Sequence, residues 1–434
     1  MTSPPDRSQV ELKICDVSVM CSGVDPKPEP RFDCTAPNAV PHITSPHEKG
    51  PALTTRRSSH ARMVTGGIPA VATALALVAA TGCDAVTSAG GEGEGETHSV
   101  EEGFHVGLLL PDLYTARYEA FDHPYFEEAL EEQCPACELS YANADGEVDE
   151  QQTQAQAMLT DGIDILVLDA VDAEAAAGTV NEASSQGVPV LAYDRLAEGG
   201  VDAYVSFDNH RVGQVQGESL LAALEEEETA GDGQLVMVNG SPTDPNAAEF
   251  KAGAHEVLDG QEEIGQEYDT PDWSPEEATT QMEGAITSLG ADEITGVLAA
   301  NDGMASGVIA ALQSAGVSTD DLPPVTGQDA ELAGIQRIVA GEQYMTVYKA
   351  IRPQAELAAQ ITVDLATGSD LQPGEHTLTQ LEDGGGEEIE SVLLEPVALT
   401  IDNNDDTVVS DGFYTIEEIC EGEYADTEYC QEAL

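Results

Sequence analysis

The segment IDILVLDAVDAEAAAGTVNEASSQGVPVLAYDR, residues 163–195, decides the fold class. It begins with an apolar run at 163–168, interrupted only by Asp164, passes through an alanine-rich amphipathic stretch at 173–186, and returns to an apolar run at 188–192. Strands that are apolar throughout are buried on both faces, which is typical of parallel sheets covered by helices. The segment therefore predicts a strand, a crossover helix and a second, parallel strand.

The same alternation continues on both sides of this unit. Further strands are predicted at residues 106–110, 235–238, 297–300 and 345–348, and further helices at 119–132, 212–224, 275–289 and 303–315. This pattern predicts an α/β fold with parallel sheets and helices on both faces. The units are too many for one modest sheet, so we predict two Rossmann-like lobes joined by a hinge. We assign residues 104–208 with about 350–380 to the first lobe, and 209–349 with about 381–434 to the second.

The chain is strongly acidic, with a formal net charge of −67 at pH 7. Between Cys83 and Leu434, only seven cationic side chains stand against seventy-five carboxylates. Such a surface repels nucleic acid and anionic lipid, which argues against DNA binding. The acidity is interpreted either as a means of solubility or as adaptation to high salt, where ions screen the self-repulsion. We favour salt adaptation.

The seven cations fall into two groups by their sequence context. One group lies beside polar and aromatic motifs at predicted strand ends: Arg117, Arg195, Lys251 and Lys349. Since ligands of parallel sheets bind beyond the carboxyl ends of the strands, we expect these four in one buried polar site. The other group is interpreted as ordinary surface ion pairs, which contribute little to stability: Arg211, Arg337 and Arg352.

The sequence before the folded part has the features of a secreted lipoprotein. In residues 53–83, three arginines precede an apolar run at 68–80, and small residues then lead to Cys83. This pattern predicts a lipoprotein signal peptide with lipid attachment at Cys83, although Ala80 stands where Leu is more usual. The apolar run is too short to span a bilayer. Residues 84–103, rich in Gly and Glu, are predicted to form a flexible acidic tether.

Residues 1–52 are rich in Pro, Ser and Cys and show no periodicity. A signal peptide should begin near the chain start, so we interpret this extension as spurious, from a misplaced start codon, or as disordered. Leu53 or Met63 would then be the true start. A genuine cytoplasmic extension is the alternative.

Four cysteines follow the signal: Cys134, Cys137, Cys420 and Cys430. The Cys-Pro-Ala-Cys motif at 134–137 has no zinc partner pair at suitable spacing, and no redox-domain pattern surrounds it. Four cysteines allow three disulfide pairings, of which the local one, 134 with 137 and 420 with 430, is the simplest. Free thiols are not expected outside the cell.

Polar and aromatic motifs follow the predicted strands or lie in the loops beyond them. They read PDLYTARY at 111–118, AYDR at 192–195, NGSPTDPN at 239–246, FK at 250–251, DW at 272–273, AND at 300–302, GQDA at 327–330 and TVYK at 346–349. Because the carboxyl ends of parallel strands meet at one edge of a sheet, we expect these motifs to lie around one ligand site.

In this order and spacing, the motifs resemble the sugar-binding lipoproteins of ABC importers in the periplasmic-binding-protein type I superfamily, most closely its xylose-binding members, over about residues 104–415. The resemblance implies two lobes that close on one sugar in the cleft between them. The residue types agree with this, because sugar hydroxyls both donate and accept hydrogen bonds and so need carboxylates paired with Arg or Lys. The apolar faces of the ring need aromatic walls, which Tyr118 and Trp273 could supply. By motif the resemblance implies ten sugar contacts: Arg117, Tyr118, Asp194, Arg195, Asn246, Lys251, Trp273, Asn301, Asp329 and Lys349. The pattern has Arg at the position of Lys251, and Trp is expected at that of Tyr118. These departures bear on the choice of sugar more than on the fold.

Several residues near the motifs have structural interpretations beside the functional one. Asn246 could cap the helix after Pro245 instead of contacting a sugar, and Asp302 is interpreted as a helix cap. The pair at 208–209 is assigned to the hinge. Three aromatic residues are interpreted as core or pocket walls: Tyr193, Phe207 and Phe250. The histidines have no metal-like spacing, so neither a metal nor a cofactor is expected.

We therefore expect a monomeric receptor on the outer face of the cell membrane, held there only by its lipid. It would capture a monosaccharide, D-xylose or a related aldose, and deliver it to an ABC permease. A sugar sensor that presents its ligand to a chemoreceptor or sensor kinase would use the same site. A transcription repressor of the same fold would need a helix-turn-helix segment, which residues 1–52 lack.

An enzyme is disfavoured because nucleophile elbows, phosphate-binding loops and metal-ligand spacings are missing from the sequence. Asp194 and Asp329 could form a glycosidase acid/base pair. However, the adjacent Arg195 would hold Asp194 ionised.

Overall fold

The computed structural model describes residues 97–434. The predictions for residues 1–52, for the signal with Cys83 and for most of the tether lie outside these residues. The end of the predicted tether is described, and it packs on the domain: the His98 N–H donates to the Ala366 carbonyl at 3.0 Å, and the His98 ring lies 3.4 Å from Asp164. Residues 97–103 therefore differ from the flexible tether that we predicted up to residue 103. The uninterrupted Gly/Glu run ends before them, at Glu96.

The first sheet has seven strands in the order β10-β11-β5-β4-β3-β1-β2, and only β10 runs antiparallel to its neighbour. The strands are β1 (His105–Leu110), β2 (Glu138–Asn143), β3 (Ile165–Leu168), β4 (Val190–Tyr193), β5 (Ala203–Phe207), β10 (Leu378–Glu382) and β11 (Glu388–Leu394). All four residues of β3 are buried, as the continuous apolar run predicts.

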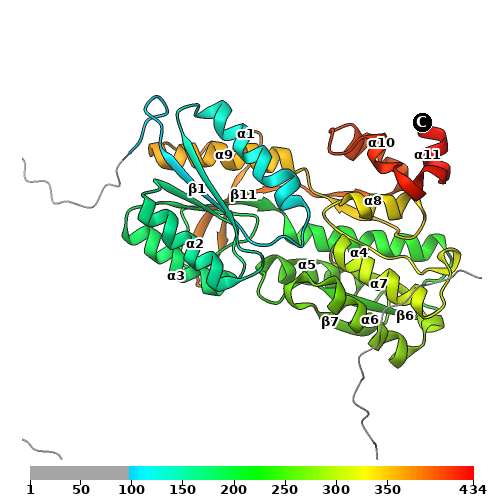
Figure 1. The fold of residues 1–434 in the computed structure, drawn as a ribbon. Helices are drawn as coiled ribbons and strands as arrows, with labels where there is room; N and C mark the ends of the chain where they lie inside the picture. Colours follow the sequence, from blue (N-terminus) through cyan, green and yellow to red (C-terminus); the bar gives the residue numbers. More distant parts are fainter. Residues whose placement is uncertain (1–96) are drawn as a thin grey trace, which may run out of the picture. The chain divides into compact units, whose positions relative to one another are not determined.

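Helices cover both faces of this sheet (Figure 1). On one face lie η1 (Tyr118–Asp122), α1 (His123–Gln133) and α9 (Ile351–Thr367), and on the other lie α2 (Val148–Asp161) and α3 (Ala173–Ser185). The alternating side chains of one strand serve the two cores, because Leu108 packs with α1 and α9 whereas Leu109 packs with α2 and α3. The Asp172 side chain caps α3 by accepting a hydrogen bond from the Ala175 N–H at 2.8 Å.

The second sheet has three parallel strands in the order β7-β6-β8: β6 (Gln234–Asn239), β7 (Ile264–Asp269) and β8 (Ile294–Ala299). A two-stranded antiparallel sheet of β9 (Thr346–Tyr348) and β12 (Val397–Leu399) accompanies it. Val325 bridges to Val297 of β8, and Val347 donates to the Gly327 carbonyl, so the small sheet continues the order beyond β8. The surrounding helices are α4 (Asn209–Glu226), α5 (Pro245–Leu258), α6 (Pro275–Leu289), α7 (Asp302–Ser314) and α8 (Leu332–Val339).

These elements confirm the predicted α/β class with parallel sheets between helices. One boundary differs from the prediction. We assigned residues from about 381 onward to the second lobe, but β11 pairs in parallel with β5, with Ser391 opposite Tyr204. The buried Val392 and Leu394 of β11 join the core of the seven-stranded sheet, so residues 381–394 belong to that sheet instead.

The C-terminal residues form short elements packed beside α8 (Figure 1). Here lie η5 (Ile401–Asn403), η6 (Asp405–Val409), α10 (Ile416–Ile419), η7 (Gly422–Asp426) and α11 (Glu428–Ala433); elsewhere the short helices are η2 (Pro271–Trp273), η3 (Ala291–Glu293) and η4 (Thr319–Asp321). Disulfides join Cys134 to Cys137 and Cys420 to Cys430, which is the local pairing. Within residues 97–434, no helix combines the length and apolarity that crossing a membrane requires.

Candidate functional site

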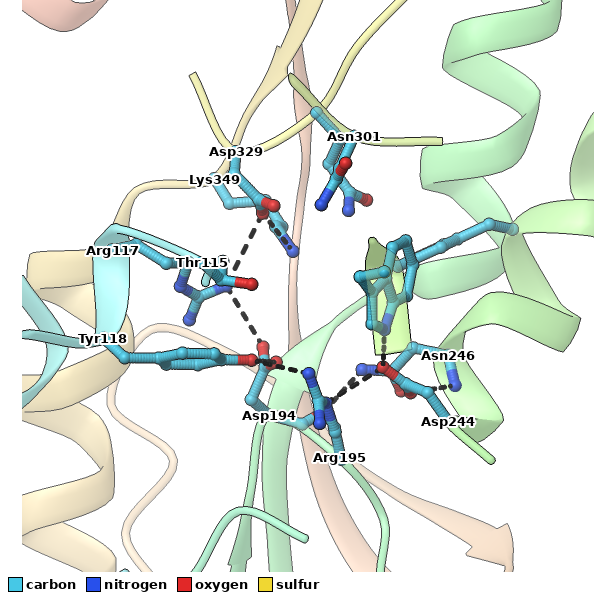
Figure 2. A pocket seen from close by; sticks show the side chains of 13 residues that line it. Thr115, Arg117, Tyr118, Asp194, Arg195, Asp244, Asn246, Asn301, Asp329 and Lys349 are labelled. Carbon is cyan, nitrogen blue, oxygen red and sulfur yellow. Dashed lines mark hydrogen bonds and ion pairs between the residues drawn. The ribbon is translucent and has the colours of Figure 1, made fainter. Parts of the chain in front are cut away.

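Segments that follow strands of both sheets converge on one pocket (Figure 2). It contains about 290 Å³ of atom-free space, counting its open mouth. The lining residues are Thr115, Arg117, Tyr118, Asp194, Arg195, Asp244, Asn246, Phe250, Trp273, Asn301, Gln328, Asp329 and Lys349. Nine of the ten residues predicted to contact a sugar are in this set. The carboxyl ends of the strands face the pocket, and this is the edge at which α/β sheets bind their ligands.

Arg117 lies between β1 and η1 and connects two carboxylates of the pocket to the buried Asp122 of η1. Its Nε and Nη2 atoms lie 2.9 and 2.7 Å from the two carboxylate oxygens of Asp122, a bidentate arrangement. Its Nη1 atom lies 3.3 Å from Asp194 Oδ1 and 3.8 Å from Asp329 Oδ1. The guanidinium is therefore oriented by Asp122 and faces one carboxylate from each side of the pocket.

Asp194 directly follows β4 and is held by its backbone as well as by its charge. Its carbonyl accepts hydrogen bonds from Tyr204 Oη at 2.8 Å and Ser206 Oγ at 2.7 Å, and its φ of 60° lies in the left-handed region. Burial alone would raise the pKa of Asp194, but nearby cations, Arg117 first and then Lys349, lower this pKa to about 2. Asp194 is therefore an ionised hydrogen-bond acceptor at neutral pH.

Arg195 and Asp244 connect the loops after β4 and β6. Arg195 Nε lies 2.9 Å from Asp244 Oδ2, and Arg195 Nη2 lies 3.2 Å from Asp112 Oδ2. The same Asp244 oxygen accepts a hydrogen bond from Trp273 Nε1 at 3.2 Å. Burial raises the pKa of Asp244, and Arg195 only partly offsets this effect. Asp244 thus joins a cation of the first sheet to the aromatic wall of the second.

The Trp273 ring packs directly against the backbone of Gly240. A Cβ atom on Gly240 would lie 2.1 Å from Trp273 Cη2, so only glycine permits this approach. Trp273 itself has a φ of 53° and is buried, with Phe250 edge-on at a centroid distance of 6.2 Å. The indole is therefore fixed as a wall of the pocket.

Lys349 follows β9 and pairs with Asp329. Its Nζ atom lies 2.8 Å from Asp329 Oδ1 and 5.8 Å from the ring centroids of Phe207 and Phe250. Both charged side chains are buried. Two aromatic faces and one carboxylate thus surround the ammonium group, an arrangement that stabilises a buried cation.

Asn246 and Asn301 line the pocket and also make hydrogen bonds that stabilise the backbone around it. Asn246 Nδ2 donates to the Asp194 carbonyl at 3.0 Å, and its Oδ1 accepts from Asn209 Nδ2 at 2.9 Å. Asp244, not Asn246, caps α5. Asn301 Oδ1 caps α7 by accepting from the Met304 N–H at 2.8 Å, so the predicted cap Asp302 is one residue off.

Lys251 lies outside the set that lines the pocket. Its Nζ atom lies 2.6 Å from Glu267 Oε1 and 3.1 Å from Asp269 Oδ1, and about a third of its side chain is exposed. Lys251 follows Phe250 on α5, and this helix directs the neighbouring side chains apart. The structure therefore does not bring Lys251 together with the other predicted residues.

Four lining residues were not among the predicted contacts: Thr115, Asp244, Phe250 and Gln328. Phe250 agrees with its interpretation as a core or wall residue. Asp244 had a recognisable signal, since Asp before Pro is typical of a helix start. Gln328 had no signal beyond its position next to Asp329.

Outside the pocket, the cations divide differently from the prediction. Arg211 and Arg352 form exposed pairs with Glu218 and Glu128, as interpreted. Arg337 does not: it is buried, and it donates to the Asp302 carbonyl at 2.8 Å and to Gln343 Oε1 at 3.0 Å. Among residues 97–434, no group of three or more His, Cys, Asp or Glu side chains is arranged to hold a metal ion.

Comparison with known proteins places this architecture in one family. A model described as "Periplasmic binding protein domain" matches residues 106–370. The chain is 34% identical over 320 residues to the D-xylose-binding periplasmic protein of Escherichia coli (strain K12), covering 72% of this chain and 92% of that protein. It is 30% identical over 334 residues to the multiple sugar-binding periplasmic receptor ChvE of Rhizobium radiobacter, with coverages of 72% and 92%.

A solved structure agrees with this placement. The ABC transporter solute binding protein from Clostridium phytofermentans, with bound β-D-glucose, has a TM-score of 0.66 and 29% identity, and the match covers 73% of this chain and 99% of that one. The family model and the relatives both extend over more than half of the chain. The chain therefore belongs to the periplasmic-binding-protein family.

Proposed function

We propose that this chain binds one monosaccharide, D-xylose or a related aldose, between its two sheets and delivers it to an ABC importer. One observation carries the proposal: three buried cation–carboxylate pairs converge with an aromatic wall in a single pocket. The pairs are Arg117 with Asp194, Arg195 with Asp244, and Lys349 with Asp329. Such pairs offer donors and acceptors side by side, which matches the hydroxyl groups of a sugar.

The charge balance of the pocket supports a neutral ligand. Three cations and three carboxylates line it, and each cation already contacts a carboxylate. An anionic ligand would add a buried charge without a free counter-charge, which is costly. Three or four hydrogen bonds to charged groups, at about 1.5–3 kcal/mol each less the ordering cost, would give roughly micromolar affinity.

The names of the relatives support an aldose, since they include a D-xylose-binding protein and a multiple sugar-binding receptor. Lys251 stands where the xylose-binding pattern has Arg, and it lies outside the pocket. The proposal therefore includes related aldoses as well as D-xylose. Binding without chemical conversion is the better reading of Asp194, because a carboxyl with a pKa of about 2 is a poor proton donor at neutral pH. The receptor would close its lobes on the sugar and present the closed form to the permease.

A titration tests this proposal. The full chain is mixed with D-xylose, D-glucose, D-ribose, L-arabinose, D-galactose and D-xylonate, while the fluorescence of Trp273, the only Trp in the sequence, is followed. We expect a saturable change with one or two aldoses at micromolar concentration and none with the xylonate anion. Folded protein that responds to none of the aldoses would contradict the monosaccharide assignment. Release of sugar from aryl glycosides would instead favour an enzyme.

We also propose that the mature protein is a monomer anchored outside the cytoplasm by a lipid on Cys83. The apolar run and small residues before Cys83 support this anchor. Cells that express the full chain and are fed an alkyne fatty acid should label it, and Cys83→Ala should abolish the label. Equal labelling of both would exclude Cys83 as the attachment site. Light scattering should give the mass of one chain.

A further inference from the structure

Gln328 combines deep burial with an amide oxygen that has no hydrogen-bond partner. The side chain lines the pocket, and the residue is only 2% exposed. Its Oε1 atom makes no hydrogen bond to any residue in the described part of the chain. Buried polar groups nearly always have a partner, so an exception on a pocket wall indicates a partner that comes from outside the protein.

The backbone around Gln328 is firmly held, so the missing partner does not result from a loosely placed loop. The Gln328 carbonyl accepts from the Asp302 N–H at 3.0 Å, and the Asp329 N–H donates to the Val347 carbonyl at 2.9 Å. The preceding Gly327 carbonyl accepts from Gln216 Nε2 at 3.0 Å. Asp329 and Ala330 both have positive φ values, 85° and 48°. Strained backbone of this kind persists where the surroundings fix it, and it is common at ligand sites.

We propose that the Gln328 amide accepts a hydrogen bond from one sugar hydroxyl and thereby selects ligands that carry a hydroxyl at that carbon. The inference rests on the proposed function and adds a specificity residue to it. Gln328 lies next to Asp329, which pairs with Lys349, so the same hydroxyl region would meet an amide, a carboxylate and an ammonium group. A site built to hydrogen-bond a hydroxyl rejects the analogue that lacks it, because its own polar groups are then left unpaired.

The test compares Gln328→Met with the wild-type full chain. Methionine has nearly the same length but cannot accept a strong hydrogen bond. We expect the Kd for the bound aldose, with D-xylose and D-glucose as probes, to rise about tenfold or more. Without sugar, the Tm should stay the same or rise, because the substitution removes an unpaired buried group. Each monodeoxy derivative of the two sugars is also titrated. One derivative should bind the wild type about tenfold more weakly, and Gln328→Met should not distinguish it from its parent.

Gln151→Met is the matched control. Gln151 is also buried, but both of its amide atoms are bonded, Nε2 to the Asp169 carbonyl at 2.8 Å and Oε1 to the Val171 N–H at 3.0 Å. This variant should lower the Tm and change the Kd less than about twofold. Gln328→Asn keeps the amide group on a side chain that is one methylene shorter. It replaces Gln328→Met as the test if that variant does not fold, and it should also raise the Kd.

Two failures are distinguishable. If the wild type binds none of the sugars, the proposed function fails and this inference fails with it. If the wild type binds a sugar, but the Gln328 variants lower the Tm and keep its Kd and its discrimination among the derivatives, then Gln328 is structural and only this inference is overturned.

Discussion

Arg195 and Asp244 form a buried ion pair, with Nε and Oδ2 2.9 Å apart, that joins the loop after a strand of the seven-stranded sheet to the loop after a strand of the three-stranded sheet. The pair is part of a larger charge cluster, since Asp112 and Asp169 also lie near the same guanidinium, at 3.2 and 3.7 Å. Arg195 thus lies against three buried acidic side chains. Removing the Arg195 side chain should therefore destabilise the packing of both sheets.

Arg195→Met should lower the free energy of unfolding by about 3–5 kcal/mol, because it leaves buried carboxylates without a cation. Asp244→Asn should cost less, since Arg195 keeps two other partners. In the double variant we expect a coupling of about 0.5–3 kcal/mol between the two sites. Urea denaturation of the four proteins measures this coupling, and strictly additive effects would show that the pair is not energetically linked.

Asp194 should contribute to the acid sensitivity of the fold. Its folded-state pKa of about 2 lies below the ordinary value of 3.8, so the folded state favours the ionised form. This stabilisation, on the order of 2 kcal/mol, is fully present above about pH 4 and is lost as the pH falls toward 2. The unfolding free energy of Asp194→Asn should therefore change less between these pH values than that of the wild type. A parallel pH profile would mean that Asp194 is not stabilised by its cations.

Gly240→Ala should disturb the aromatic wall while leaving every charge in place. The added Cβ would come within 2.1 Å of the Trp273 ring, so the indole must move. We expect a red-shifted Trp273 emission and a Kd for the cognate aldose at least about tenfold higher. Ala285→Gly, in α6 away from the pocket, is a control for general loss of stability. An unchanged emission maximum would contradict the packing.

The same substitution should change the Kd only slightly at Lys251 but strongly at Lys349. Lys251→Met removes a partner of Glu267 and Asp269 that is about a third exposed, and it should change the Kd less than about threefold. Lys349→Met removes a buried cation from the pocket and should raise the Kd at least about a hundredfold. Calorimetric titration of both variants checks the contrast. A large effect of Lys251→Met on the Kd would show that Lys251 does contribute to sugar binding.

The Tm of the protein should increase with salt concentration. The formal net charge of −67 makes the folded chain repel itself, and added ions screen this repulsion. We expect a Tm higher by about 5 °C or more in about 2 M NaCl than in about 0.1 M NaCl. Sucrose at matched water activity controls for general exclusion effects, and a Tm that does not change with NaCl would argue against salt adaptation.

The strands that are apolar along their whole length could be predicted from the sequence alone. Buried strands such as β3 and β4 were predicted because every side chain must be apolar when both faces are covered. The edge strands β2 and β7 were missed, because their partly exposed residues lack this continuous pattern. Nine of the pocket-lining residues were predicted from the resemblance of their motifs to the family, and they converge because the motifs follow strands whose carboxyl ends meet at one edge.

Which of these residues contact one another depends on how the helices and strands pack, and the sequence does not show this. Lys251 has the right charge in the right motif, yet the turn of α5 directs it to Glu267 on β7 rather than to the pocket. Residues 381–394 join the first sheet because a parallel strand needs an open edge, and β5 provides it. The partners of Asp244 and the missing partner of Gln328 depend on atoms far apart in the chain. Local sequence sets each side chain's chemistry and its element, but side-chain direction and long-range partners follow only from how the elements pack.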